Sequence, residues 1–289
     1  LRSKIVSRST LNALGLRLGL DRHIIVQGGG NFAQKHLYGD ALEAMVGSAN
    51  CDYYDGTGIY KQLGYVPYDV KSTGSSMTLE YAYDDWVIYR TARRMGLSDE
   101  AETYRRRALN YRNVFDPETG FARARMSDGS WKPDFNRYDT HGQGFIEGNS
   151  WNYSMYVPHD PAGLIALMGG DGQFTARLDS LFTEYLPDRY FAQTEDVTRE
   201  GLLGMYVHGN EPSHHVPYLY MWTSQPWKTQ YWVREIMDLP ICTVRRSTAC
   251  AATTTAARCR RGTFSRRWDS IPSARAPTSM CWAHPTCLI

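Results

Sequence analysis

Long apolar runs, closely spaced cysteine pairs and an initiating methionine are all missing from this sequence. No apolar stretch approaches the roughly 20 residues of a membrane-spanning helix, so we expect no membrane span. Asn12 and Arg17 interrupt the apolar residues near the start, which argues against a secretory signal there. Because the chain begins with Leu1, we expect the natural N-terminus to lie elsewhere. The six cysteines include no C-x-x-C pair, which argues against a zinc site.

Tyrosine and lysine are absent from residues 241–289, although the whole chain has 20 tyrosines. This segment instead holds eight arginines, five of the six cysteines and a single acid, Asp269. Its charge of +7 leaves −5 on residues 1–240, because the whole chain carries +2. So abrupt a change indicates a boundary near residue 240. Residues 1–37 are basic and irregular, and we predict no regular structure for them or for residues 241–289.

Residues 38–240 read as one helix after another, which predicts an all-α domain. One helix is marked by an apolar face and ends at Gly96; the face consists of Leu79, Ala82, Tyr83 and Trp86. Ser98 is expected to cap the next helix, with an inward stripe formed by Ala101, Tyr104, Ala108, Tyr111 and Phe115.

Further along, capping and turn residues divide the chain into shorter elements. Residues 116–120 (DPETG) predict a turn, and Asp160-Pro161 a helix start that Gly169-Gly170 closes. Asp171 is expected to open a helix with four inward residues, Phe174, Leu178, Leu181 and Phe182. Ser224 and Pro226 can start a last helix through Met237. Long loops between these helices are the expected place for function.

Two segments carry candidate chemistry. Glu147 lies beside a glycine and close to Trp151 and Tyr153, where partial desolvation would raise the pKa of a carboxyl group as a general acid requires. An isolated surface glutamate is the competing interpretation. The second segment, His208 to His215, reads HGNEPSHH and contains no H-E-x-x-H motif, so a zinc peptidase is not indicated. Its Asn and Glu oxygens suit calcium better than zinc, although a polar loop tied by its own hydrogen bonds stays open.

A third pattern points elsewhere. Gly28, Gly30 and Ala33 match G-x-G-x-x-A after an apolar run, the fingerprint of dinucleotide binding. That fingerprint needs a helix start and a second parallel strand, whereas Gly39 interrupts any such helix and no β-α alternation follows. A flexible glycine link is favoured over a dinucleotide-dependent oxidoreductase.

Several segments together resemble glycoside hydrolase family 92, the exo-acting α-mannosidases. In family order they are residues 64–67 (GYVP), 78–86 (TLEYAYDDW), 113–120 (NVFDPETG), 147–153 (EGNSWNY), 157–160 (VPHD), 167–170 (LMGG), 208–215 (HGNEPSHH) and 225–229 (QPWKT). The resemblance covers residues 40 to 239. It implies an (α/α)6 barrel, here incomplete, with irregular N- and C-terminal segments.

The same resemblance implies a calcium-dependent, inverting exo-hydrolysis of α-mannosides, α-1,2-linked mannose of glycans above all. By motif position, Glu147 is the expected acid, while Glu211 and Asn210 are the expected metal-binding residues. Four residues are expected to contact sugar or to order the loops: Trp151, His208, His214 and His215. Asp52 and Tyr53 are expected to border the same pocket. Mannose-containing glycans are the expected partners, without nucleic acid. A secreted or periplasmic location is implied by the family alone.

From about residue 240 the chain departs from the family pattern. The acidic block that would carry the catalytic base and further calcium ligands has no counterpart in residues 241–289. We interpret this segment as the product of a reading-frame shift near residues 239–242. An inverting site with an acid but no base predicts little hydrolysis, so a non-catalytic mannose-binding remnant is the alternative function.

Overall fold

The computed structural model of the protein describes residues 37–52, 55–191 and 199–239. Residues 1–36 and 240–289, including the glycine pattern at 28–33 and the arginine-rich segment, lie outside the described residues. The α-helices are α2 (Leu37–Asn50), α3 (Thr57–Leu63), α4 (Gly74–Arg94), α5 (Ser98–Arg107), α6 (Ser150–Tyr153), α7 (Pro161–Leu167), α8 (Asp171–Thr183), α9 (Asp188–Phe191) and α10 (Trp227–Asp238).

Shorter elements connect these helices. The 3-10 helices are η2 (Asn110–Val114), η3 (Arg199–Gly201), η4 (Glu211–Ser213) and η5 (Val216–Trp222). The named strands form antiparallel hairpins of two residues a strand: β1 (Phe115–Asp116) with β2 (Phe121–Ala122), and β3 (Leu202–Leu203) with β4 (Tyr206–Val207). The mostly helical composition agrees with the expected all-α class. Across the described ranges, however, the helices do not establish the closed barrel that the family resemblance implies.

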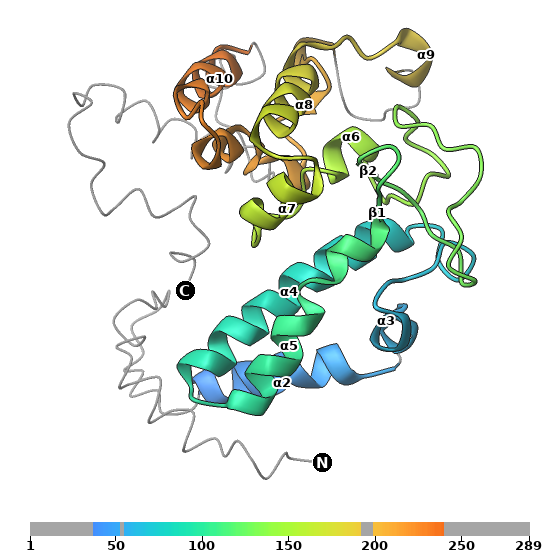
Figure 1. The fold of residues 1–289 in the computed structure, drawn as a ribbon, viewed down its shortest axis with the longest axis vertical. Helices are drawn as coiled ribbons and strands as arrows, with labels where there is room; N and C mark the ends of the chain where they lie inside the picture. The colour runs from blue at the N-terminus through green and yellow to red at the C-terminus, as the bar shows by residue number, and fades with distance from the viewer. Residues whose placement is uncertain (1–36, 53–54, 192–198, 240–289) are drawn as a thin grey trace, which may run out of the picture.

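Helix α4 is the longest described element, and α2 and α5 lie along it (Figure 1). Its expected apolar face is confirmed, because Leu79, Ala82 and Trp86 are buried. Arg93 and Arg94 lie in its last turn, where their positive charges are stabilised by the negative end of the helix dipole. Gly96 follows in the left-handed conformation (φ 75°) and ends the helix. The far half of α4 packs with α2 and α5 in a small core centred on Leu42, Ile88 and Tyr104.

The helix after Gly96 differs from its prediction at both ends. Ser98 is the first helical residue rather than the cap; Leu97 holds the cap position and makes no side-chain cap bond. The helix ends at Arg107, and the chain tightens into η2 before the first hairpin. All five residues of the expected inward stripe, from Ala101 to Phe115, are nevertheless buried. Tyr111 stays on the inward side because η2 carries the helical turn onward past Arg107. The expected turn closes this hairpin, where Gly120 N donates to Asp116 O at 2.8 Å.

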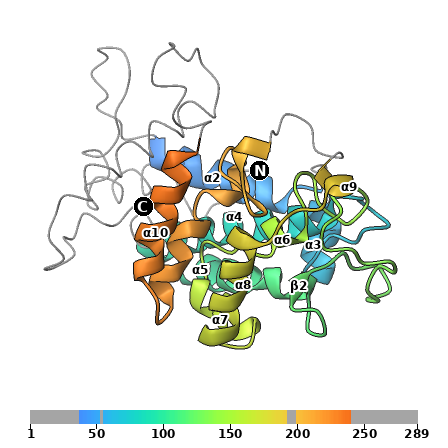
Figure 2. The same cartoon turned by 90° about the horizontal axis from the view of Figure 1, so that it is seen from above.

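Helices α6, α7, α8 and α10 form a second group, beyond the N-terminal end of α4 (Figure 1). Figure 2 shows α7, α8 and α10 gathered on one side. Asp160 caps α7 as predicted, accepting a hydrogen bond from Gly163 N at 2.9 Å. The four expected inward residues of α8 are all buried. Phe182 among them stacks on Trp232 of α10 at 4.6 Å between ring centroids. Within the described segments, no helix is long and apolar enough to cross a membrane.

Candidate active site

Glu147 is held by a tight turn that its neighbours in sequence require. Gly148 adopts φ 62°, and a Cβ there would come within 2.8 Å of Asn152 Oδ1, so only glycine fits without strain. Asn149 then caps α6: its Oδ1 accepts from Trp151 N at 3.0 Å, while Asn152 Oδ1 accepts from Asn149 N at 3.2 Å. The segment EGNSWN therefore encodes one rigid turn that places a carboxylate just before a helix.

The start of α4 fixes the same turn from the other side. The backbone N–H groups of Ser75 and Ser76 donate to Gly144 O at 3.0 and 3.1 Å. Ser76 Oγ in turn accepts from Ile146 N at 3.1 Å, one residue before Glu147. Helix N-terminal N–H groups have no partner within their own helix, so this loop satisfies them. The backbone on both sides of Glu147 is thus anchored.

Two further contacts join α6 to distant segments. Ser150 Oγ donates to Ala122 O of β2 at 2.6 Å, and both groups are buried. Asn152 Nδ2 donates to Met205 O at 2.9 Å, just ahead of β4. Because β4 leads directly into His208, this second bond ties the turn of Glu147 to the start of the histidine-rich segment.

The histidines of that segment take different positions. His208 shares a hydrogen bond of 2.8 Å between its Nδ1 and the hydroxyl of Tyr206, and its ring lies 5.2 Å from that of His214. His215 Nε2 lies 2.6 Å from Met155 O, and a carbonyl can only accept, so Nε2 carries the proton. Burial, with the charge of His159 adding to it, lowers the pKa of His215 to about 4. His215 is therefore neutral at pH 7, with Nδ1 as its acceptor.

The expected metal-binding residues are only partly visible. Asn210 lies at the start of η4 in extended conformation and is partly exposed, while the side chain of Glu211 lies outside what the structure describes. Among the described side chains, no group of three or more His, Cys, Asp and Glu residues is placed to hold a metal ion. The side chain of Glu211 is not among these, so calcium binding by Asn210 and Glu211 stays a prediction.

One sequence-based expectation about Glu147 and Trp151 needs correction. Glu147 is exposed, although neighbouring aromatic rings were expected to desolvate it. Trp151 instead turns inward: only 3% of it is exposed, and its ring meets that of Phe121 edge-on at 4.8 Å. The cause is the α6 cap, which directs Trp151 into the core while leaving Glu147 outside. This packing suits the expected alternative in which Trp151 orders the loop, and sugar contact by Trp151 stays a prediction.

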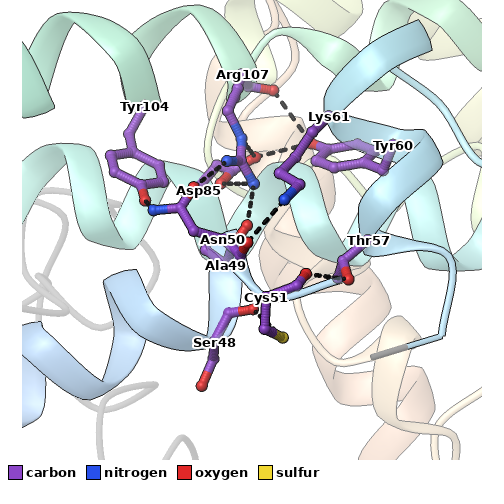
Figure 3. Close-up of polar contacts among 10 residues, drawn as sticks. All are labelled: Ser48, Ala49, Asn50, Cys51, Thr57, Tyr60, Lys61, Asp85, Tyr104 and Arg107. Atoms are coloured by element: carbon purple, nitrogen blue, oxygen red, sulfur yellow. Dashed lines mark hydrogen bonds and ion pairs between the residues drawn. The ribbon is translucent and has the colours of Figure 1, made fainter. Parts of the chain in front are cut away.

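Asp52 lies in the loop after α2, and Tyr53 lies outside the described residues. Asp52 pairs with Lys61 of α3: Lys61 Nζ lies 2.5 Å from Asp52 Oδ1. The same Nζ also donates to Asn50 O. Figure 3 shows the neighbouring network, in which Arg107 reaches Ala49 O and the carboxylate of Asp85. No hydrogen bond among the described residues joins Asp52 to Glu147. A place for Asp52 beside the pocket stays a prediction.

Tyr153 and Glu80 belong to this site although sequence reasoning did not single them out. Tyr153 is fully buried, yet its hydroxyl donates to Glu80 Oε1 of α4 at 3.2 Å. Burial raises the pKa of Tyr153, and the negative charges of Glu80 and Glu147 raise it further. Both residues lie in segments that resemble the family, 78–86 and 147–153, but no local pattern pairs them.

Comparison with known proteins places this geometry in a family. The model of the glycosyl hydrolase family 92 catalytic domain matches residues 23–239. The match thus begins ahead of residue 38, where the domain was expected to start, and stops at the expected boundary near 240. An uncharacterized secreted glycosidase of Arthroderma benhamiae is 29% identical over 223 residues, which cover 64% of this chain and 26% of that protein.

Solved structures agree. A family GH92 alpha-mannosidase from Bacteroides thetaiotaomicron has a TM-score of 0.64 and 36% identity, covering 79% of this chain and 28% of that one. A family GH92 inverting mannosidase from the same organism has a TM-score of 0.60 and 40% identity, covering 68% and 28%. The chain thus spans little more than a quarter of the length of these relatives. From the domain match and these structures, the chain belongs to glycosyl hydrolase family 92.

Proposed function

We propose that this chain carries part of the catalytic site of a glycoside hydrolase that acts on α-mannosides. The support is its family, together with solved neighbours that are mannosidases, one of them in complex with mannoimidazole. Mannose-containing glycans are then the substrate class, with terminal α-1,2-linked mannose as the first linkage to test.

The observation that carries the proposal is the fixed, exposed carboxylate of Glu147. Backbone anchors from α4 and the α6 cap hold it at the surface, where a glycosidic oxygen can reach it. In an inverting reaction one carboxylic acid protonates the leaving oxygen, while a second carboxylate, roughly 6.5–9.5 Å away, activates water. We assign Glu147 the first role. His208, His214 and His215, which follow the tie to Met205, are assigned to sugar hydroxyls or to ordering the loop.

Calcium belongs to the proposal as well. Asn210 and Glu211 would supply hard oxygen ligands of the kind calcium prefers. Bound calcium would hold sugar hydroxyls and favour ring distortion. Removal of calcium with a chelator is then expected to weaken mannoside binding by the whole chain.

The family match ends at residue 239, and we infer that the base-bearing part of the family's domain has no counterpart in residues 241–289. Loss of a general base is expected to cost about 10²–10⁴ in rate. This favours a second candidate function, a mannose-binding remnant that does not cleave its ligand.

Two measurements on the 289-residue chain separate these functions. Calorimetry with methyl α-mannoside and calcium measures binding, and release of mannose from an α-1,2-mannobioside measures hydrolysis. We expect binding with little hydrolysis, and Glu147→Gln should abolish whatever hydrolysis remains. Glu102→Gln, an exposed α5 carboxylate paired with Arg105, is the matched control. Absence of mannoside binding would contradict both the hydrolase and the mannose-binding function. Hydrolysis at the rate of intact relatives would contradict the mannose-binding remnant alone.

Location follows the same reasoning. The curated relative is named a secreted glycosidase, and glycan degradation takes place outside the cytoplasm. We therefore propose a secreted or periplasmic protein, which fractionation of the source cells would test.

A further inference from the structure

Glu80 occupies the outer side of α4, directly after the buried Leu79. Its Oε1 accepts a hydrogen bond from Tyr153, a residue that is otherwise enclosed. The ring of Tyr153 stacks on Phe145 at 5.3 Å between centroids and meets Tyr156 edge-on at 6.1 Å. This packing leaves the phenol little freedom, so the hydroxyl holds the Glu80 carboxylate in one place.

Hydrogen bonds locate Glu80 relative to Glu147. Ser76, one turn before Glu80 on α4, accepts from Ile146 N at 3.1 Å through its Oγ. Tyr153, in the helix that follows Glu147, donates to Glu80 Oε1 at 3.2 Å. Coulombic influence falls with distance, and both carboxylates act on the same phenol, raising its pKa beyond the effect of burial. The neighbouring Tyr81 responds to Glu80 as well: burial raises its pKa first, followed by the charges of Asp55, Asp84 and Glu80. Glu80 therefore lies on the part of α4 that contacts the turn of Glu147.

Such a gathering of acids works against stability. Asp84 follows Glu80 by four residues on the same helix, and like charges at this spacing destabilise a helix by a few tenths of a kcal/mol. The bond from Tyr153 satisfies a buried hydroxyl and at the same time orients the exposed carboxylate of Glu80. That carboxylate is well suited to binding a ligand rich in hydroxyl groups, because an ionised carboxylate only accepts hydrogen bonds and has about four acceptor positions.

We propose that Glu80 is a substrate-binding residue of the Glu147 site, accepting a hydrogen bond from one hydroxyl of the mannoside, with Tyr153 as its positioning residue. The inference rests on the proposed function, since it assigns a further residue to the same pocket. It predicts that one sugar hydroxyl, and no other, is coupled to Glu80.

Calorimetry on the full chain, with calcium present at pH 7, tests this assignment. Glu80→Gln keeps the shape of the side chain but loses the charge-assisted bond, and should weaken methyl α-mannoside binding about tenfold. Tyr153→Phe should weaken it about threefold, because the carboxylate stays but is less well held. Glu102→Gln, the matched exposed glutamate on α5, should bind like the unaltered chain.

Deoxy sugars identify a direct contact. Mannosides that lack one hydroxyl in turn are titrated into the unaltered chain and into Glu80→Gln. For one of them the difference between the two proteins should vanish, which a purely structural effect of the substitution would not produce. Glu80→Asp provides a second variant should Glu80→Gln unfold, and thermal denaturation of each variant checks this.

The outcomes distinguish failure of the proposed mannoside function from failure of the Glu80 role alone. If the unaltered chain binds no mannoside, the proposed function fails and the role of Glu80 fails with it. If the unaltered chain binds and Glu80→Gln binds within twofold, or every deoxy sugar shows the same difference, only the role of Glu80 is lost.

Discussion

Arg107 binds the carboxylate of Asp85 through two nitrogens, with Nε 3.0 Å from Oδ2 and Nη2 2.9 Å from Oδ1. This pair joins α5 to the middle of α4 (Figure 3). The carboxylate is almost wholly buried and also accepts a bond from Tyr60 at 2.8 Å. Burial raises the pKa of Asp85 to about 6 in spite of the arginine. The Arg107–Asp85 pair therefore contributes little net stability itself, but loss of the arginine would leave the buried Asp85 carboxylate without a counter-charge.

Arg107→Met is expected to lower the free energy of unfolding by about 3–5 kcal/mol, because it leaves a buried carboxylate without its counter-charge. Urea denaturation followed by fluorescence measures the change. Arg105→Met removes an exposed partner of Glu102 and should change stability by less than about 1 kcal/mol. Equal effects of the two substitutions would contradict the buried character of the Asp85 pair.

His159 should make stability fall with acid. Its Nε2 bonds to Ala108 O at 2.9 Å, and burial lowers its pKa from 6.5 to about 4. A depressed histidine pKa contributes stability that is present above pH 6.5 and lost as pH falls through 4, here about 3 kcal/mol. His215 acts in the same direction, whereas Asp85 acts in the opposite one, losing its contribution as pH rises through 6.

A difference measurement isolates the histidine. His159→Gln keeps a donor for Ala108 O but cannot be protonated, so the free energy of unfolding should fall less between pH 7 and pH 4 than in the unaltered chain. His141→Gln, at an exposed position, should keep the original pH dependence. An identical slope in all three proteins would contradict the assignment.

Gly148→Ala should strain the turn that holds Glu147. An alanine at φ 62° costs about 1–2 kcal/mol, and its Cβ would press on Asn152 Oδ1. We expect lower stability together with weaker mannoside binding. Gly47→Ala in α2, where a new Cβ meets no atom within 4 Å, should instead stabilise by about 0.5–1 kcal/mol and leave binding unchanged. Unimpaired binding by the first variant would show that the turn does not position the site.

The coding DNA for residues 236–289 tests the reading-frame interpretation. Translation in one of the two other frames is expected to give an acidic segment followed by aromatic residues. If neither frame does so, the arginine-rich segment is the true product of its gene and its origin must be sought elsewhere.

Local patterns predicted the helices well and the site only in part. The stripe of α4 and the cap at Asp160 depend on near neighbours, so sequence sufficed for both. The direction of Trp151 depends on Phe121 and on the hairpin that carries it, which no local pattern reveals. Glu80 could not be found either, because its partner Tyr153 lies 73 residues away. The family resemblance supplied Glu147, and the structure supplied its setting.

The contacts that assemble this site also set when it can form. Ser76 with Ile146, Asn152 with Met205, His215 with Met155 and Tyr153 with Glu80 are separated by 53 to 73 positions along the chain. Closing such long loops costs entropy before any contact repays it, so chains rich in distant contacts fold slowly. During refolding, the turn of Glu147 should order after the α4–α5 pair, and a mannoside that binds it would act as a late trap for the native state.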